Sequence, residues 1–276
     1  MKIALIVNFE KSNSKETAFK IIDILNANNV EIISDKETSL QLDNKSMVCD
    51  DVFSLCDILI IIGGDGTIIH NAKLAAVASK PVLGVNTGRI GYLAGVESSD
   101  LNAISSLFCG GYKIEERIML EITHLKDNEK NDYIAFNDAV ISKGNLSRLI
   151  DINLNLEGTN IKYRADGLIL ATPTGSTAYS MSAGGPVVHP LVENIVVTPI
   201  CPYSYFTKSL VLPKDTEISV SVDAIENKQA YLTIDGEIAV EINPNDEISA
   251  KICETKVKLI NINSESIYNC LERKNK

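Results

Sequence analysis

The chain has 276 residues, 45% of them hydrophobic, which is enough apolar material for one large domain or two of ordinary size and argues against intrinsic disorder. Its formal net charge of −10 opposes binding to nucleic acid and to anionic membranes, so we expect neither as a partner. The apolar run at residues 58–62 is far shorter than the roughly 18 residues of a membrane helix. The run at residues 3–7 is too short for a signal peptide, and we therefore expect a cytoplasmic protein.

The first part of the chain alternates short apolar runs with helical patterns. Ala18, Ile21, Ile22 and Leu25 recur at the spacing of one helix face, which predicts a helix that begins near residue 13 or 14. Strands are predicted at residues 2–8, 30–33, 58–62 and 81–85, and further helices on Ile68, Ala72, Ala75 and Ala76 and on Leu101, Ile104, Leu107 and Phe108, the last capped by Ser98 or Ser99. This order predicts an α/β domain with a parallel sheet over residues 1–112.

The pattern changes after Gly110-Gly111, where apolar and polar residues begin to alternate singly. Residues 150–156 and 218–222 show this strand period, and two more alternating runs flank Asp235-Gly236, a pair typical of two-residue hairpin turns. We therefore expect a mostly β second domain at residues 113–251. Residues 252–276, with a helix at 264–274, are expected to pack back on the first domain.

The segment Gly63-Gly64-Asp65-Gly66-Thr67 joins a predicted strand to a predicted helix. This arrangement aims backbone N–H groups and a helix amino terminus at one point, which is an anion site that needs no basic residue. Its spacing fits neither common phosphate-loop fingerprint. A carboxylate here is costly, because like charges about 4 Å apart repel by roughly 4 kcal/mol at an effective dielectric of about 20. Asp65 either accepts the proton of an attacking hydroxyl, binds Mg²⁺, or caps the helix.

Two further segments are rich in groups that bind ligands. Residues 84–95 follow a strand, contain several glycines and include Arg89, whose planar guanidinium suits phosphate; the alternative is a flexible loop. Residues 166–186 crowd hydroxyl side chains, which bind sugar and amide groups without adding charge. A serine nucleophile is disfavoured there, because Gly-x-Ser-x-Gly is absent and His189 has no clear acidic partner. A Ser/Thr-rich turn without a ligand is the other alternative.

These segments form an ordered series that resembles the motifs of NAD kinases. The series comprises residues 63–67, residues 86–88, Asn137-Asp138, and Asp166-Gly167 followed by residues 172–179. The Gly-Gly-Asp-Gly loop alone is shared with lipid kinases and phosphofructokinases, and the long Thr/Ser/Tyr segment narrows the match. The resemblance implies a Rossmann-like amino-terminal domain, a β-rich carboxy-terminal domain and a homodimer or homotetramer. It also implies ATP or polyphosphate as donor, with Mg²⁺ or another divalent cation carried by the donor phosphates rather than by protein ligands.

The resemblance also implies residue roles. Asp65 would activate or orient the 2′-hydroxyl of the adenosine ribose of NAD, and Asp166 would contact the nicotinamide side across a subunit contact. The full set of implied binding residues is Gly64, Gly66, Thr67, Asn86, Arg89, Asn137, Asp138, Arg164, Asp166, Thr174, Thr177, Ala178, Tyr179 and Ser182. The family's usual pair is Asn-Glu, so the Asp138 carboxylate has a shorter reach. Asp235-Gly236-Glu237 matches a tripeptide of the family, but the hairpin accounts for it.

Two other functions remain open from the sequence. A kinase for lipids or sugar phosphates could use the same loop, although the charge of −10 opposes a membrane substrate. A sensor could bind NAD without turnover, although a pure binder gains nothing from Asp65 at its phosphate loop.

Overall fold

The computed structural model describes residues 1–88, 91–144, 148–203, 206–223, 229–244, 246–262 and 271–272. The chain divides into two compact units, one made of Met1–Arg117 with the chain from Lys256 on, and one made of Ile118–Thr255. The first unit extends past the predicted boundary at residue 112, because β7 (Lys113–Arg117) pairs with β20 (Val257–Asn261) in the same sheet. Its carboxy-terminal part begins at Lys256 rather than at residue 252.

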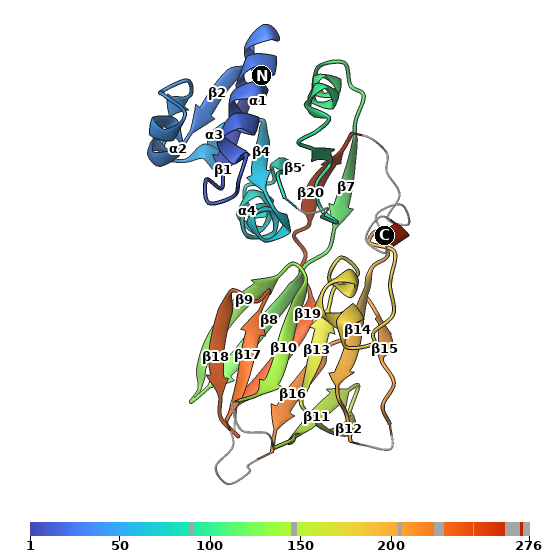
Figure 1. The fold of residues 1–276 in the computed structure, drawn as a ribbon. Helices are drawn as coiled ribbons and strands as arrows, with labels where there is room; N and C mark the ends of the chain where they lie inside the picture. The colour runs from blue at the N-terminus through green and yellow to red at the C-terminus, as the bar shows by residue number, and fades with distance from the viewer. Residues whose placement is uncertain are drawn as a thin grey trace. The chain divides into compact units, whose positions relative to one another are not determined.

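The first unit is built on one eight-stranded sheet with the order β3-β2-β1-β4-β5-β20-β7, and β6 pairs with β5 (Figure 1). Its other strands are β1 (Lys2–Val7), β2 (Glu31–Ser34), β3 (Met47–Val48), β4 (Ile58–Gly63), β5 (Pro81–Asn86) and β6 (Val96–Glu97). Its helices are α1 (Ser14–Ala27), α2 (Lys36–Gln41), α3 (Val52–Leu55), α4 (Asp65–Val77) and the 3-10 helix η1 (Leu101–Phe108). All its strand pairs are parallel except β20 with β7, which confirms the predicted α/β fold.

Helices cover both faces of this sheet because its strands are apolar on both sides. On one face, Ile21 of α1 and Ile104 of η1 share a core with Leu5 of β1. On the other face, Gly84 of β5 lies against Ile68 of α4, where an added Cβ would come within 2.6 Å of Ile68 Cδ1. Glycine at this position therefore lets α4 lie close to the strands that carry the first motif.

The structure differs from the local predictions in two respects and leaves a third prediction untested. The segment Leu101–Phe108 is a 3-10 helix whose N-cap is Asp100 without a side-chain cap bond, so the predicted α-helix capped by Ser98 or Ser99 is wrong. The short helices α2 and α3 were not predicted, and each is capped by an aspartate, Asp35 or Asp51. The helix predicted at 264–274 lies mostly outside the described residues.

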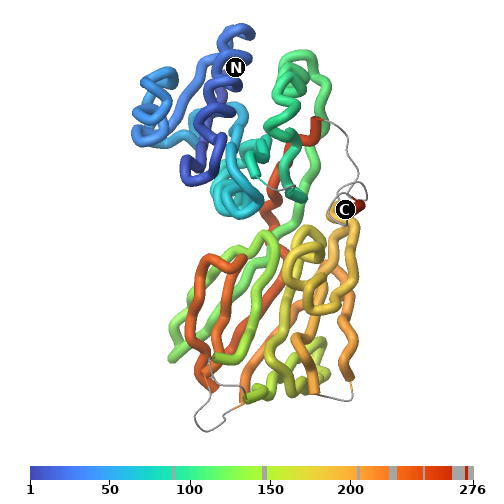
Figure 2. The backbone as a smooth tube through the Cα atoms, viewed as in Figure 1, coloured from blue at the N-terminus to red at the C-terminus, as the bar shows by residue number. Residues whose placement is uncertain are grey.

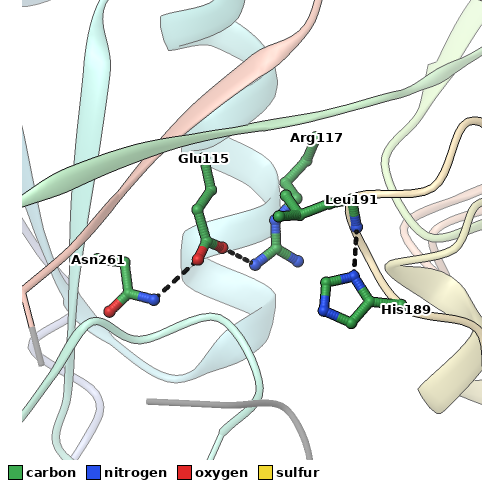
Figure 3. Close-up of polar contacts among 5 residues, drawn as sticks. All are labelled: Glu115, Arg117, His189, Leu191 and Asn261. Atoms are coloured by element: carbon green, nitrogen blue, oxygen red, sulfur yellow. Dashed lines mark hydrogen bonds and ion pairs between the residues drawn. The ribbon is translucent and has the colours of Figure 1, made fainter. Parts of the chain in front are cut away.

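Strand β20 is the described element that returns to the first unit, and its trace runs beside β7 in Figure 2. A side-chain contact joins the two strands: Asn261 Nδ2 of β20 donates to Glu115 Oε1 of β7 at 2.8 Å (Figure 3). The other oxygen of Glu115 pairs with Arg117 at the end of its own strand. Arg117 is buried. It is the last residue of the first of the two segments that make up this unit.

The second unit consists of two six-stranded antiparallel sheets (Figure 1), with the orders β15-β14-β13-β10-β17-β18 and β12-β11-β16-β19-β8-β9. Their strands are β8 (Leu120–Lys126), β9 (Glu129–Ala135), β10 (Asp138–Lys143), β11 (Ile150–Leu156), β12 (Thr159–Ala165), β13 (Gly167–Ala171), β14 (Asn194–Ile200), β15 (Leu210–Pro213), β16 (Ile218–Val222), β17 (Ala230–Ile234), β18 (Ile238–Ile242) and β19 (Glu247–Ile252). Alternate residues such as Ile152 and Leu168 face inward from the two sheets and form one core. The mostly β second domain is thus confirmed. No helix in the described ranges is long and apolar enough to span a bilayer.

Candidate functional site

The Gly63–Thr67 segment forms an open elbow between β4 and α4. Gly64 is the N-cap of α4 in an extended conformation, and a Cβ added at Gly64 or Gly66 would meet no atom within 4 Å. Thr67 lies at the base of the elbow, where its Oγ1 accepts a hydrogen bond from Asn8 Nδ2 at 2.9 Å. Gly63 has no room for a side chain, since a Cβ would lie 2.8 Å from Thr67 Oγ1. The open backbone N–H groups and the helix dipole make this elbow suitable for phosphate.

Asp65 is the first residue of α4, but its side chain does not cap that helix. Its Oδ2 accepts the backbone N–H of Tyr92 at 2.9 Å, and its Oδ1 accepts that of Leu93 at 3.4 Å. The neighbouring Gly91 is packed so tightly that a Cβ there would lie 2.1 Å from Asp65 Oδ1. The helix-cap reading of Asp65 is therefore wrong. The carboxylate instead joins the first glycine-rich segment to the second.

The second segment follows β5 and is fixed mainly by Asn86. Asn86 Nδ2 donates to Glu97 Oε2 at 2.8 Å, and its Oδ1 accepts the backbone N–H of Gly88 at 3.1 Å. The next residue, Thr87, shares a 3.0 Å hydroxyl contact with Ser14 of α1 and donates its N–H to the carbonyl of Gly63 at 3.2 Å. Asn86 is 2% exposed, and these two bonds hold the start of the second segment; its predicted contact with a ligand stays a prediction.

Arg89, the predicted phosphate-binding residue of this segment, lies outside the described residues.

In the second unit, the Asn137-Asp138 pair is locked against the hydroxyl-rich segment. The Asn137 carbonyl accepts the N–H of Thr172 at 2.9 Å, and Asp138 pairs with Ala171 across the β10–β13 ladder. Gly175 approaches so closely that a Cβ there would lie 2.0 Å from the Asn137 carbonyl oxygen. The structure therefore brings together these two predicted motifs, which are far apart in sequence.

Asp138 is 5% exposed, and its environment changes its protonation. Burial, followed by the negative charge of Asp235, raises the pKa of Asp138 from 3.8 to about 7. Near neutral pH this carboxyl group therefore exists in both protonated and ionised forms. It can donate a hydrogen bond as well as accept one.

Asp235 lies at the turn between β17 and β18, beside the same segment. Its carboxylate accepts the backbone N–H groups of Phe136, Asn137 and Asp138, with the shortest distance, 2.7 Å, to Asn137 N. From the sequence alone, the hairpin turn accounts for this residue, and these three contacts are not predictable.

The hydroxyl groups of the 172–180 segment are mostly satisfied inside the protein. Ser176 Oγ donates to the Pro173 carbonyl at 2.6 Å, and Ser180 Oγ lies 2.9 Å from Thr198 Oγ1. Thr174 differs, because its Oγ1 is buried and has no hydrogen-bond partner among the described residues. A buried hydroxyl without a partner is costly, and a bound ligand would satisfy it.

The other residues of this segment that are predicted to bind a ligand differ in exposure. Thr177 is buried, Ala178 is partly buried, and Tyr179 and Ser182 are exposed. A serine nucleophile receives no support from the contacts of Ser176 and Ser180. The nearby His189 uses Nδ1 to accept the backbone N–H of Leu191 at 3.3 Å within its own loop (Figure 3).

Arg164 lies near the end of β12, and Asp166 lies between β12 and β13. The Asp166 carboxylate pairs with Lys143 Nζ at 2.5 Å, and the Lys143 N–H donates to the Asp166 carbonyl at 2.9 Å. Arg164 has an exposed side chain near the end of β12, and its carbonyl accepts the N–H of Tyr203 at 2.7 Å. The negative charge of Asp166 is therefore paired with the positive charge of Lys143 in the same chain.

No group of three His, Cys, Asp or Glu side chains gathers at metal-ligand distance within the described part of the chain. A cavity of about 490 Å³ in the second unit contains none of the predicted site residues. Its lining includes four carboxylates, Glu157, Asp215, Glu217 and Glu247, which would repel phosphates.

Comparison with known proteins identifies the family. Residues 3–109 match the family model described as ATP-NAD kinase N-terminal domain, and residues 136–262 match the one described as ATP-NAD kinase C-terminal domain. The chain is 36% identical to the NAD kinase of Moorella thermoacetica in an alignment that covers 99% of this chain and 88% of that protein. The chain belongs to the NAD kinase family.

Other NAD kinases are similar over almost their whole length. The enzyme of Symbiobacterium thermophilum is 36% identical over 99% of this chain and 98% of its own. The crystal structure of yeast NADH kinase complexed with NADH matches with a TM-score of 0.85 and 25% identity, over 100% of this chain and 86% of that one. An NAD kinase from Archaeoglobus fulgidus in complex with ATP has the same fold, with a TM-score of 0.72, 23% identity and coverage of 99% and 98%. These matches confirm the family resemblance inferred from the motifs.

Proposed function

We propose that the protein transfers the terminal phosphoryl group of ATP to the 2′-hydroxyl of the adenosine ribose of NAD, which gives NADP. The observation that carries this proposal is the position of Asp65. Its carboxylate stands at an open phosphate-binding elbow and is held there by the N–H groups of Tyr92 and Leu93. Family membership supports both the reaction class and the substrates.

The first unit binds the donor in this proposal. The backbone N–H groups around Gly64, Gly66 and Thr67 hold its phosphates, and the positive end of the α4 dipole attracts their charge. Arg89 adds a planar cation from the neighbouring segment. Mg²⁺ or another divalent cation, carried by the donor phosphates, neutralises their charge when bound.

Asp65 accepts the hydrogen bond of the attacking hydroxyl and orients it in line with the phosphorus atom. Each of its two oxygens receives one backbone N–H, which leaves further lone pairs for the hydroxyl. Holding the two reacting atoms in place can contribute about 7–11 kcal/mol. Proton acceptance by a carboxylate typically adds a factor of about 10²–10⁴.

The second unit binds NAD. Asn137 and Asp138 hold the adenosine part together with Thr174, whose buried Oγ1 has no partner among the described residues, and Asp166 contacts the nicotinamide side. The family's usual glutamate reaches one methylene farther than Asp138. The raised pKa of Asp138 lets this carboxyl group donate as well as accept a hydrogen bond near neutral pH.

The remaining predicted NAD contacts come from the same unit: Arg164, Thr177, Ala178, Tyr179 and Ser182. We propose a homodimer or homotetramer in which Asp166 acts across the subunit contact. Analytical ultracentrifugation at assay concentration measures this directly, and a monomer that turns over at the full rate would exclude it.

The test uses purified protein with NAD, ATP and Mg²⁺, followed by an NADP-specific dehydrogenase that reports NADP. We expect NADP from NAD, and parallel reactions with polyphosphate or NADH define the donor and acceptor range. Tight NAD binding without NADP would instead support a sensor. Turnover of ATP only with a lipid or sugar phosphate would support a different kinase.

A further inference from the structure

The turn between β17 and β18 explains only in part why an aspartate stands at position 235. Asp235 and Gly236 have φ angles of 50° and 71°, which are the left-handed values that a two-residue hairpin turn requires. Asparagine adopts these values at least as readily as aspartate. The turn therefore accounts for the backbone of Asp235 but not for its charge.

The carboxylate of Asp235 binds the chain at the start of β10. Oδ1 accepts the N–H groups of Phe136, Asn137 and Asp138 at 3.1, 2.7 and 3.1 Å, and Oδ2 accepts that of Phe136 at 2.9 Å. In return, the Asp235 N–H donates to the Asp138 carbonyl at 2.9 Å. Three successive N–H groups converge on one oxygen of this carboxylate, and an ionised acceptor makes stronger bonds with them than a neutral amide oxygen would.

We infer that Asp235 is a positioning residue that fixes the Asn137-Asp138 segment in the shape in which it binds the adenosine part of NAD. This inference rests on the proposed function, which assigns that pair to NAD. The opposite side of the segment is already fixed, because Gly175 packs on the Asn137 carbonyl and Thr172 Oγ1 donates to the Phe136 carbonyl at 2.7 Å. Without Asp235, the N–H side of the same segment would lose its partners.

Asp235 also sets the electrostatic environment of Asp138. Across the β10–β13 ladder Asp138 faces Ala171, which is uncharged, and from the β17 side it faces Asp235. The negative charge of Asp235 adds to the effect of burial in raising the pKa of Asp138. Removal of that charge therefore lowers the pKa of Asp138.

The decisive variant is Asp235→Asn, which keeps the size and the turn preference but loses the charge and one acceptor oxygen. We expect the KM for NAD to rise by roughly tenfold or more, with the KM for ATP within about twofold of the parent. The pKa that Asp138 contributes to the pH profile of kcat/KM for NAD should move to a lower value. The matched control is Asp127→Asn, since Asp127 has a φ of 50° in the β8–β9 turn, and we expect it to behave as the parent.

A second variant, Asp235→Glu, retains the charge in a longer side chain. It should raise the KM for NAD while leaving the pH profile in place, and melting temperatures show whether each variant is folded. An unchanged KM for NAD and an unchanged pH profile in folded Asp235→Asn would overturn the inference. Failure of the parent protein to make NADP would overturn the proposed function instead, and NAD binding by calorimetry would still report on Asp235.

Discussion

The Asp65 carboxylate lies directly against Gly91, at a point where no side chain fits. A Cβ on Gly91 would come within 2.1 Å of Asp65 Oδ1 and within 2.9 Å of its Cγ. The position of the proposed catalytic carboxylate is thus set by a glycine that follows it by a whole helix and strand.

Gly91→Ala is expected to lower kcat by roughly tenfold or more, because the added methyl displaces Asp65 from Tyr92 N and Leu93 N and misorients the hydroxyl. Steady-state kinetics would show a larger change in kcat than in the KM for NAD, since most of the proposed NAD-binding residues lie in the other unit. Gly111→Ala is the matched control, because its Cβ would come no closer than 3.3 Å to Ser106 Cβ. Equal kcat for the two variants would show that Gly91 does not hold Asp65.

The raised pKa of Asp138 predicts a pH-dependent stability difference. Because the folded pKa of about 7 exceeds the ordinary value of 3.8, this group favours folding below pH 4 and loses that contribution as pH rises through 7. Asp138→Asn cannot titrate, so its stability relative to the parent should increase between pH 4 and pH 8. The gain should reach a few kcal/mol, about 4 at most, at about 1.4 kcal/mol per pH unit.

Urea unfolding of both proteins at pH 4.5, 6 and 8 measures this difference. A constant difference across that range would contradict a buried Asp138 that stays partly protonated at neutral pH. The same variant should bind NAD more weakly. Its effect on stability and its effect on NAD binding are measured separately.

The environment of the Tyr163 hydroxyl predicts that its removal does not lower the stability of the protein. Tyr163 is fully buried in the core of the second unit, its burial raises the pKa of its hydroxyl, and that hydroxyl has no partner among the described residues. Tyr163→Phe should therefore leave the free energy of unfolding unchanged or raise it by about 1 kcal/mol. Thr198→Val is the contrasting control, because it removes the hydrogen-bond partner of the buried Ser180 hydroxyl. It should lower the free energy of unfolding by about 1–3 kcal/mol. A clear loss of stability in Tyr163→Phe would show that its hydroxyl is bonded.

Removal of divalent cations should abolish turnover and leave the fold intact. A chelator strips from the donor phosphates the cation that the proposed reaction uses, whereas the proposed function gives the cation no part in folding. Activity should return on addition of Mg²⁺, and the melting temperature should stay constant throughout. A large drop in melting temperature on chelation would reveal a structural metal held by the protein.

The sequence was sufficient to predict the elements with strong apolar periodicity. The stripe Ala18, Ile21, Ile22 and Leu25 became the buried face of α1, because a single amphipathic face determines both the helix and its packing. Leu101–Phe108 has a similar stripe but forms a 3-10 helix, since eight residues of periodicity do not distinguish the two hydrogen-bond patterns. The short helices α2 and α3 depend on aspartate caps and carry little periodic signal.

The sequence motifs were sufficient to identify residues of the candidate site, but not the contacts that those residues make. Asp65 was identified, yet its partners lie 27 and 28 residues away, and those of Asp235 lie 97 to 99 residues away. The buried pair of His124 Nε2 and Asp246 Oδ2, 2.8 Å apart across 122 residues, shows the same limit. In each case a carboxylate meets its partner only through the sheet topology, which a local pattern does not encode.

The most direct test of the proposed mechanism is the turnover of Asp65→Asn beside its affinity for NAD. Asparagine preserves the size of the side chain but is a far weaker proton acceptor, so kcat should fall by roughly 10²-fold or more, with the Kd for NAD within about threefold of the parent. Asp51→Asn is the matched control, since Asp51 caps α3 outside every motif, and it should keep full turnover. Near-normal turnover of folded Asp65→Asn would contradict the role assigned to this carboxylate.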